Sequence, residues 1–262
     1  MKAAIDRQNY AVMNQRHSDK SGLDDFPTPP WATRALCEHP WFAHSIANSN
    51  ILEPAAGRGY MAYALRGYTW PGKRVVTADI AEYEPALGGY YGKNVVQDFL
   101  DTKNPVLDAL IGLDGGGWVI TNPPFKSAAS FARRALRAKA SVALFVRLNW
   151  LESEERYELF DEFPLSAVLL FSSRVGLKQG ECSPLVSTAT AYCWVVWHRT
   201  LSHAPAPAGF LFCGAVNWLP PTARKHHEYE YDYPGFTATS RSPLTGRLIW
   251  KPNAAWSGAR RG

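Results

Sequence analysis

A short segment near the middle of the chain combines an amide side chain, two prolines and an aromatic ring. Asn122-Pro123-Pro124-Phe125 directly follows the apolar stretch Trp118–Thr121, so it falls where a strand is expected to end. A proline keeps the residue before it extended, and neither proline has an N–H group to donate. The side-chain oxygen of Asn122 and the backbone carbonyls are therefore left as acceptors beside a flat ring. This arrangement suits a planar molecule with an amino group, although an ordinary strand-ending turn has the same composition.

A glycine-containing loop lies upstream, between the short apolar strand Ile51–Glu53 and the expected helix Met61–Leu65. Glycine lets the backbone approach a ligand closely, and free N–H groups at a helix start attract a carboxylate or phosphate. A second strand, Arg74–Asp79, ends in an acid. Asp79 follows Gly59 by 20 residues, the spacing of a ribose-binding acid after a nucleotide loop. The loop matches neither G-x-G-x-x-G nor G-x-x-x-x-G-K-[ST], so the evidence is the order of strand, loop, helix, strand and acid.

Together these motifs resemble those of class I S-adenosylmethionine-dependent methyltransferases, and specifically of enzymes that methylate exocyclic amino nitrogens. Leu52–Gly59 is similar to their cofactor loop, and Asn122–Phe125 is similar to their catalytic motif. Asp25–Trp31 resembles the F-x-T-P segment of adenine-N6 DNA methyltransferases. The order of the three segments is that of gamma-type enzymes. The resemblance covers roughly residues 24–199 and is greatest to small DNA methyltransferases of phages and prophages.

The resemblance implies methyl transfer from S-adenosylmethionine to adenine N6, with nucleic acid, and DNA in particular, as the partner. Asn122 Oδ1 and the Pro123 carbonyl would accept the two amino hydrogens of the base, and Phe125 would stack on it. Because N-P-P-F also occurs in other amino-methyltransferases, two alternatives stay open: adenine N6 or guanine N2 of rRNA or tRNA, and glutamine N5 of a protein. Cytosine N4 is a further acceptor, although its usual motif begins with Ser. A non-catalytic nucleic-acid-binding domain is the alternative outside the enzymes.

The resemblance also implies which residues hold each ligand. The residues with a catalytic role would be Asn122, Pro123, Pro124 and Phe125. The residues that contact the cofactor would be Thr28, Pro29, Glu53, Pro54, Ala55, Gly57, Gly59, Asp79, Ile80, Asp98, Phe99 and Asn122. The residues that contact the substrate would be Phe125, Lys126, Arg147 and Lys178.

Individual roles follow within these groups. Asp79 would accept hydrogen bonds from both ribose hydroxyls, Asp98 from the adenine amino group, and Phe99 would pack on the adenine ring; Asp101 is an alternative to Asp98. Lys126 and Arg147 flank the expected pocket mouth and could contact phosphates or simply be solvated charges. Lys178 lies in the glycine-bearing segment 174–183, which we take as a candidate target-recognition loop from its position.

Alternating strands and helices must position these residues. Beyond the two strands above, we expect strands at 94–100, 118–121, 141–146, 168–171 and 191–197, and helices at 33–44 (broken by Pro40), 127–139 and 152–160. This alternation predicts an α/β fold, and the resemblance implies the Rossmann-like fold of class I methyltransferases, with a seven-stranded, mostly parallel sheet flanked by helices. Ligands of such sheets bind beyond the carboxyl ends of the strands, where the motifs above fall.

The chain divides into three parts by composition: a polar arm at 1–23, a methyltransferase domain at 24–200 and an irregular extension at 201–262. Prolines interrupt the extension, which carries seven basic and three acidic residues interleaved with aromatic ones, including Trp256, Arg260 and Arg261. Basic and aromatic side chains together suit nucleic acid, though the extension could equally be irregular chain packed on the core. Because only about 60 residues follow the last expected strand, we expect a short or relaxed recognition sequence.

The composition sets broader limits. With 262 residues, 46% of them hydrophobic, a folded core is expected, and a net charge of +5 is compatible with a polyanionic partner. The four cysteines are scattered and the two adjacent histidines would point apart, so we expect no metal site. The polar N-terminus and the absence of a long apolar run predict a chain without signal peptide or membrane span, in the cytoplasm of a bacterial or phage-infected cell. The oligomeric state stays open.

Overall fold

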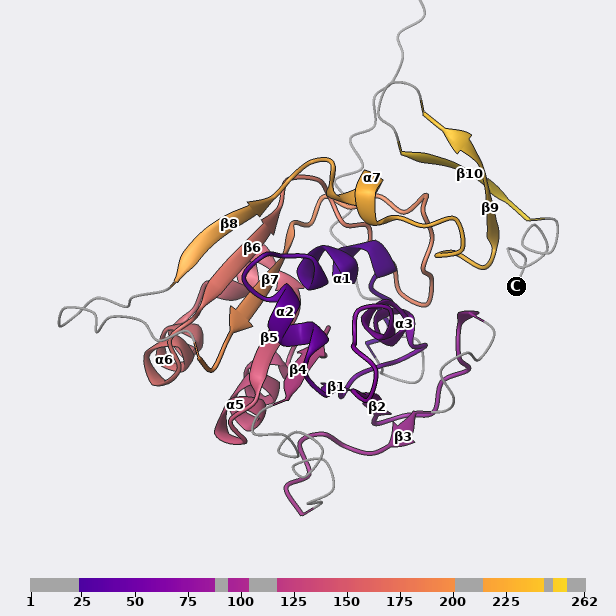
Figure 1. The fold of residues 1–262 in the computed structure, drawn as a ribbon. Helices are drawn as coiled ribbons and strands as arrows, with labels where there is room; N and C mark the ends of the chain where they lie inside the picture. The colour runs from indigo at the N-terminus through magenta and orange to yellow at the C-terminus, as the bar shows by residue number, and fades with distance from the viewer. Residues whose placement is uncertain (1–23, 88–93, 104–116, 201–213, 243–246, 254–262) are drawn as a thin grey trace, which may run out of the picture.

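An eight-stranded mixed sheet runs through the centre of the computed structural model (Figure 1). The structure describes residues 24–87, 94–103, 117–200, 214–242 and 247–253. The arm expected at 1–23 and the tail residues Trp256, Arg260 and Arg261 lie outside this part of the chain.

The strand order places the strands from the first half of the chain together. Across the sheet the order is β3 (Val95–Val96), β2 (Val75–Asp79), β1 (Ile51–Glu53), β4 (Trp118–Thr121), β5 (Ser141–Arg147), β7 (Tyr192–Trp197), β6 (Ala167–Phe171) and β8 (Ala215–Leu219). The strands from β3 to β5 are parallel, β7 is antiparallel to both of its neighbours, and β8 is parallel to β6. The prediction of a mostly parallel sheet is therefore confirmed.

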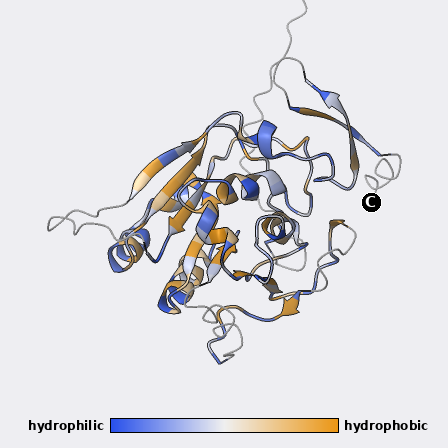
Figure 2. Ribbon diagram, in the orientation of Figure 1, coloured by the Kyte–Doolittle hydropathy of each residue, from blue (hydrophilic) through white to orange (hydrophobic). Residues whose placement is uncertain are grey.

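Helices cover both faces of the sheet, which gives three layers. Successive strand residues point to opposite faces, so Ile51 and Trp118 belong to one core cluster while Leu52 and Val119 belong to another. The first cluster includes α1 (Pro30–Cys37), α2 (Ala43–Ala47) and α3 (Tyr60–Arg66), and the second includes α5 (Ala128–Arg137) and α6 (Glu154–Glu162). Figure 2 shows the apolar strands between these more polar helices. Strands buried on both faces explain the continuous apolar runs of the sequence.

The expected count of seven strands was wrong, because β8 is an eighth strand. It lies at the edge of the sheet, and its Val216 and Trp218 are exposed. Its sequence therefore shows neither the continuous apolar run of a strand buried on both faces nor the alternation of a strand buried on one face. One other expectation needs a smaller correction, because the third strand is only two residues long. The break expected at Pro40 is confirmed, since the helices α1 and α2 lie on either side of it. Within the described ranges no helix is both long and apolar enough to cross a bilayer.

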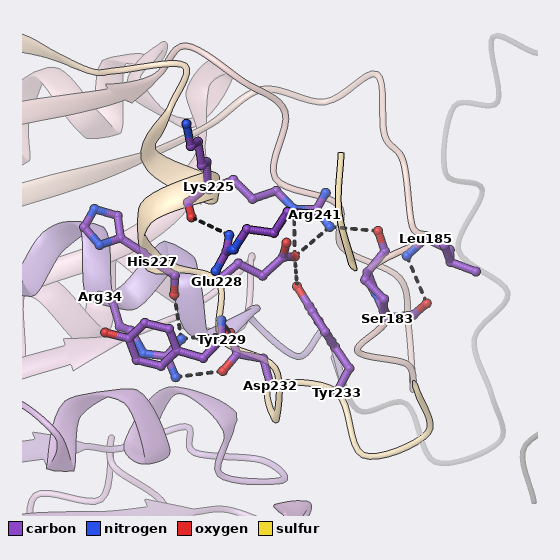
Figure 3. Close-up of polar contacts among 12 residues, drawn as sticks. Arg34, Ser183, Leu185, Lys225, His227, Glu228, Tyr229, Asp232, Tyr233 and Arg241 are labelled. Atoms are coloured by element: carbon purple, nitrogen blue, oxygen red, sulfur yellow. Dashed lines mark hydrogen bonds and ion pairs between the residues drawn. The ribbon is translucent and has the colours of Figure 1, made fainter. Parts of the chain in front are cut away.

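The segment after residue 200 is more regular than we expected. Besides β8 it contains α7 (Ala223–His227) and a separate antiparallel pair, β9 (Phe236–Arg241) and β10 (Leu248–Pro252). A buried ion pair connects this segment to α1: Arg34 Nη1 and Nη2 donate to both oxygens of Asp232 at 2.8 and 2.7 Å (Figure 3). The ring of Tyr229 packs on the same guanidinium, and the guanidinium carbon lies 3.9 Å from the ring centroid.

We expect Arg34→Ala to lower the free energy of unfolding by about 3–5 kcal/mol, because it leaves the buried Asp232 carboxylate without a counter-charge. Urea unfolding followed by far-UV circular dichroism would measure the change. The matched control is Arg137→Ala, which removes an arginine whose side chain is 66% exposed and pairs with Glu162; its loss is expected to cost under about 1 kcal/mol. Equal costs for the two variants would show that the Arg34–Asp232 pair does not anchor the C-terminal segment.

Candidate active site

A cavity of about 230 Å³ opens where the strand order changes direction, beyond the carboxyl ends of β1, β2 and β4. The chain runs outward from β1 through β2 to β3 and then returns to β4 on the other side of β1. In open α/β sheets such a switch point is where ligands bind. The side chains contributed by the three strand ends are Glu53, Asp79 and Asn122, which all line the cavity.

The loop after β1 is fixed by contacts on both sides. Gly57 and Gly59 have φ angles of 50° and 82°, in the left-handed region that favours glycine. Asp79 Oδ2 accepts a hydrogen bond from the Gly57 backbone N–H at 2.8 Å, and Asn94 Nδ2 donates to the Gly57 carbonyl at 2.7 Å. Asp79 therefore holds the loop as well as lining the cavity.

Two of the lining carboxyl groups are buried and perturbed. Glu53 is 2% exposed, and its Oε2 has no hydrogen-bond partner within the part of the chain that the structure describes. Burial raises the pKa of Glu53 well above its ordinary value, and the neighbouring Asp79 carboxylate raises it further. Burial also raises the pKa of Asp79, although the backbone N–H groups of Gly57 and Ala81 oppose this effect. A buried carboxyl oxygen with no partner marks a place for a donor or cation from a ligand.

The cavity is strongly acidic. Its described lining contains five carboxyl groups, from Asp24, Asp25, Glu53, Asp79 and Asp98, and one basic side chain. That base, Arg58, is paired with Asp25 at 3.0 Å. A ligand with several phosphates would be repelled here, whereas a cationic one would be attracted. Over the described ranges, no group of three or more His, Cys, Asp or Glu side chains is arranged to hold a metal ion.

The amide of Asn122 is oriented by the segment that precedes α1. Its Nδ2 donates to the Phe26 carbonyl and to Thr28 Oγ1, each at 3.0 Å. Since Nδ2 has two protons and both are used, Oδ1 is the atom of this side chain left to accept from a ligand. Pro29 follows in extended conformation, and α1 begins at Pro30, where a proline suits the first helical turn.

Aromatic and charged side chains gather beside the cavity around Phe125. The Phe26 and Phe125 rings lie 5.4 Å apart, and the Arg147 guanidinium carbon lies 4.3 Å from the Phe125 ring centroid. Asp24 Oδ2 accepts a hydrogen bond from the Phe125 N–H at 3.2 Å. The ring is thus held between the N-terminal segment and the end of β5.

The structure brings most of the predicted cofactor residues to one cavity. Its lining includes the predicted residues Thr28, Glu53, Pro54, Ala55, Gly57, Asp79, Ile80, Asp98, Phe99, Asn122 and Pro124. The predicted residues outside its lining are Pro29, Gly59, Pro123, Phe125, Lys126, Arg147 and Lys178. Of these, Lys126 is exposed, and Lys178 Nζ lies 2.6 Å from Glu181 Oε2. Phe99 is 1% exposed and packs on Phe131, with ring centroids 4.9 Å apart, so it also serves the core.

Several lining residues had no individual role predicted from the sequence. Of these, Asp25, Phe26, Pro27, Ala56 and Arg58 lie within the two segments that resemble the F-x-T-P segment and the cofactor loop. The others lie outside both segments: Asp24, Tyr60, Met61, Tyr83, Leu100, Ser127 and Phe131. Phe131 could have been found, because it lies six residues after Phe125, in the first turn of α5 and on its apolar face. The Asp25–Arg58 pair joins residues 33 positions apart and has no local signature.

No protein-family model matches the chain, and no curated protein sequence matches it. Among solved structures, a modification subunit assigned to a type I restriction enzyme of Vibrio vulnificus YJ016 has 14% identity and a TM-score of 0.47, over 86% of this chain; this chain spans 58% of that one. A protein assigned as a hemolysin of Lactococcus lactis has 12% identity and a TM-score of 0.42, over 64% of this chain and 86% of that one.

A protein assigned as a class I S-adenosylmethionine-dependent methyltransferase of Listeria monocytogenes has 10% identity and a TM-score of 0.43, over 72% of this chain and 65% of that one. All three TM-scores lie below 0.5. The function of this chain therefore has to be argued from its own residues.

We expect Asp79→Ala to loosen the glycine loop, because the Gly57 and Ala81 N–H groups lose their acceptor. The loss of about 1–3 kcal/mol of local stability corresponds to roughly 5- to 150-fold faster amide exchange. Hydrogen–deuterium exchange of peptides that cover residues 54–59 and 80–83 would measure it. Asp98→Ala is the control, since exposed Asp98 accepts only from the Leu100 N–H in the described contacts and should change exchange there alone. Unchanged exchange at Gly57 in Asp79→Ala would contradict the loop-holding role.

Proposed function

We propose that this chain is a methyltransferase that uses S-adenosylmethionine to methylate an exocyclic amino nitrogen, with adenine N6 in DNA as the acceptor and a short or relaxed recognition sequence. The observation that carries the proposal is Asn122. Its amide lies at the carboxyl end of β4, in the wall of an acidic cavity at the switch point, with Nδ2 engaged by the protein and Oδ1 left to accept.

The cavity fits the proposed cofactor in charge and in donor set. S-adenosylmethionine carries an ammonium, a sulfonium and a carboxylate, so its net charge is positive, and it has a ribose diol but no phosphate. The lining has an excess of carboxyl groups, which suits that net charge. Glu53 Oε2, buried and without a described partner, is suited to the positively charged methionine part. Asp79 would accept from the ribose hydroxyls, and Asp98 would accept from the adenine amino group. Thr28 and Pro29 would close the site from the N-terminal segment.

Bound S-adenosylmethionine would supply a methyl group that is already electrophilic, so the remaining task of the protein is to activate the nucleophile. The lone pair of an adenine amino nitrogen is delocalised into the ring. Asn122 Oδ1 and the Pro123 carbonyl would accept the two amino hydrogens, draw the nitrogen toward tetrahedral geometry and make its lone pair available to the methyl group. The sulfonium would lose its methyl group and leave as the neutral thioether S-adenosylhomocysteine, and the methylated nitrogen would release one proton to solvent. This is catalysis by positioning and electrostatic stabilisation.

Substrate binding would use the side chains beside the cavity. Phe125 would stack on the base, and Arg147, which packs on the Phe125 ring, would fix that ring and lie close to the incoming strand. Lys126 and Lys178 are proposed phosphate contacts. A base inside a duplex cannot reach a cavity of this kind, so the target base would have to flip out of the helix.

The experiment that tests the proposal is incubation with labelled S-adenosylmethionine and, separately, duplex DNA, single-stranded DNA, total RNA and protein extract, followed by nucleoside and peptide mass spectrometry. N6-methyladenine in DNA is the expected product. Label only in RNA, or only in glutamine N5 of protein, would keep the methyltransferase chemistry and replace the substrate. No label in any fraction would refute the enzyme itself.

We expect Asn122→Ala to lower methyl transfer by at least about 100-fold, because one of the two acceptors that activate the amino group is lost. Isothermal titration calorimetry should give a cofactor Kd within a few-fold of the original chain. Asn48→Ala is the matched control, because Asn48 is exposed at the end of α2, near the amino end of β1 and away from the cavity. Near-normal turnover by Asn122→Ala would mean that another group accepts the amino hydrogens.

Cofactor affinity should depend on pH through Glu53. Because the pKa of Glu53 is raised in the free chain, this group is partly protonated at pH values where an ordinary glutamate is ionised. A cationic ligand favours the ionised form, so binding releases protons, and affinity falls as the pH is lowered through the raised pKa. Calorimetry in buffers of different ionisation enthalpy would measure the protons released. Glu53→Gln should flatten the profile, whereas Glu154→Gln, an exposed carboxyl of α6, should leave it unchanged. An identical pH profile in Glu53→Gln would exclude Glu53 as the linked group.

A further inference from the structure

The carboxylate of the proposed cofactor has to be placed in a cavity whose lining is mainly acidic. In S-adenosylmethionine this carboxylate is attached to the same carbon as the ammonium group, so both groups must bind close together. The described lining already has five carboxyl groups, and a further carboxylate is repelled there unless a cation contacts it. Among the described lining residues, the one basic side chain is that of Arg58.

The backbone of the glycine loop has few N–H groups left for an anion. The Ala56 N–H donates to the Ala78 carbonyl at 2.9 Å, and the Gly59 N–H donates to the Ala56 carbonyl at 2.8 Å. The Gly57 N–H donates to Asp79 Oδ2 at 2.8 Å. Loops that bind phosphate or carboxylate use such backbone groups as donors. In this chain these three groups hold the loop itself, so an anion at the loop depends on a side-chain donor.

Contacts at both ends of Arg58 fix this side chain beside the loop. The Arg58 carbonyl accepts from the Ala86 N–H at 2.9 Å. At the other end, Nε and Nη2 donate to the same carboxylate oxygen, Asp25 Oδ2, at 3.1 and 3.0 Å. In the described contacts Nη1 makes no hydrogen bond. Because a guanidinium has five N–H donors, Arg58 can bind a second carboxylate while it keeps Asp25.

The charge of Arg58 acts on two tyrosines that line the cavity. Burial raises the pKa of Tyr83 to about 12, nearby carboxylates add to this effect, and the Arg58 guanidinium opposes it. Burial also raises the pKa of Tyr60, and Arg58 again opposes the shift. The guanidinium therefore lies near both hydroxyl groups. Since the Arg58 side chain is 36% exposed, it is accessible to a ligand in the cavity.

We infer that Arg58 binds the carboxylate of S-adenosylmethionine, and that Asp25 positions Arg58 for this contact. The inference rests on the proposed function, because it assigns a cofactor contact in the same cavity. It also gives Arg58 a role in specificity. On charge alone, the acidic lining favours decarboxylated S-adenosylmethionine, which lacks the anionic group and is more positively charged. Arg58 opposes this preference, because the decarboxylated compound offers it no partner.

Isothermal titration calorimetry of the full chain with S-adenosylmethionine and with its decarboxylated form tests the contact. In Arg58→Ala the Kd for S-adenosylmethionine should rise roughly 10- to 30-fold, because a charge-assisted contact is lost. The Kd for the decarboxylated form should stay the same or fall, which also shows that the variant is folded. Arg58→Lys keeps the charge and should recover part of the loss.

The matched control is Arg199→Ala, which removes an exposed arginine beside Ser141, at the amino end of β5 and away from the cavity. It should bind both compounds as the original chain does. Two results for Arg58→Ala would overturn the inference. An equal loss of affinity for both compounds would mean that Arg58 supports the loop and does not contact the carboxylate. Unchanged affinity for both would mean that Arg58 makes no contact with the cofactor.

Methyl transfer by the original chain separates this inference from the proposed function. Methyl transfer to DNA, with no selective effect of Arg58→Ala on binding, would keep the enzyme and reject the Arg58 contact. Selective loss of S-adenosylmethionine binding in Arg58→Ala, with no methyl transfer to any substrate, would keep the Arg58 contact and reject the enzyme. If the original chain bound neither compound, both proposals would be wrong.

Discussion

The parallel pairing of β1 with both β2 and β4 is the constraint on which the candidate site depends. Parallel neighbours end at the same edge of the sheet, so Glu53, Asp79 and Asn122 meet there although they are far apart in sequence. Because the strand order changes direction at β1, a space is left beyond the strand ends, and these side chains line it. The apolar alternation of Ile51 and Leu52, and of Trp118 and Val119, fixes the register by burying one residue of each pair on either face. A slip by one residue would turn the acids and the amide away from the cavity.

The segment 24–28 supplies further contacts that position the candidate site. It contacts Arg58 of the glycine loop through Asp25, and Asn122 through Phe26 and Thr28. These contacts explain why an amide, and not a carboxylate, suits position 122. An aspartate there could not donate to the Phe26 carbonyl, and two acceptors would then face each other in a partly buried wall. The orientation of the amide is therefore a property of the tertiary structure, although the side chain belongs to a strand end.

The sequence was most informative where function depends on local pattern, and least where it depends on remote contacts. Strands such as Trp118–Thr121 and Ser141–Arg147 are apolar throughout because both faces are covered, and their expected positions are confirmed. The edge strand β8 has one neighbour and an exposed Trp218, so burial imposes no pattern on it. The glycine loop and Asp79 could be located by spacing, whereas the acids of the N-terminal segment enter the cavity through the Asp25–Arg58 pair, which no spacing rule predicts. The regular structure after residue 200 was missed because the frequent prolines of this segment suggested an irregular chain, although Pro220, Pro221 and Pro234 lie between its elements and Pro252 is the last residue of β10.

The proposed function agrees with the way charge is distributed in the structure, which the net charge of +5 alone does not reveal. The described lining of the cavity has five carboxyl groups and one arginine, which is paired with Asp25, so it suits a cationic cofactor. Phosphates would be repelled from the cavity mouth by Asp24 and Asp25. A DNA backbone would therefore stay outside the cavity, and only an uncharged part of the polymer could enter it. A flipped base is such a part, and Asn122 would meet its amino group. The same separation would disfavour a free nucleotide as substrate, because its own phosphates would have to accompany the base toward the acidic wall.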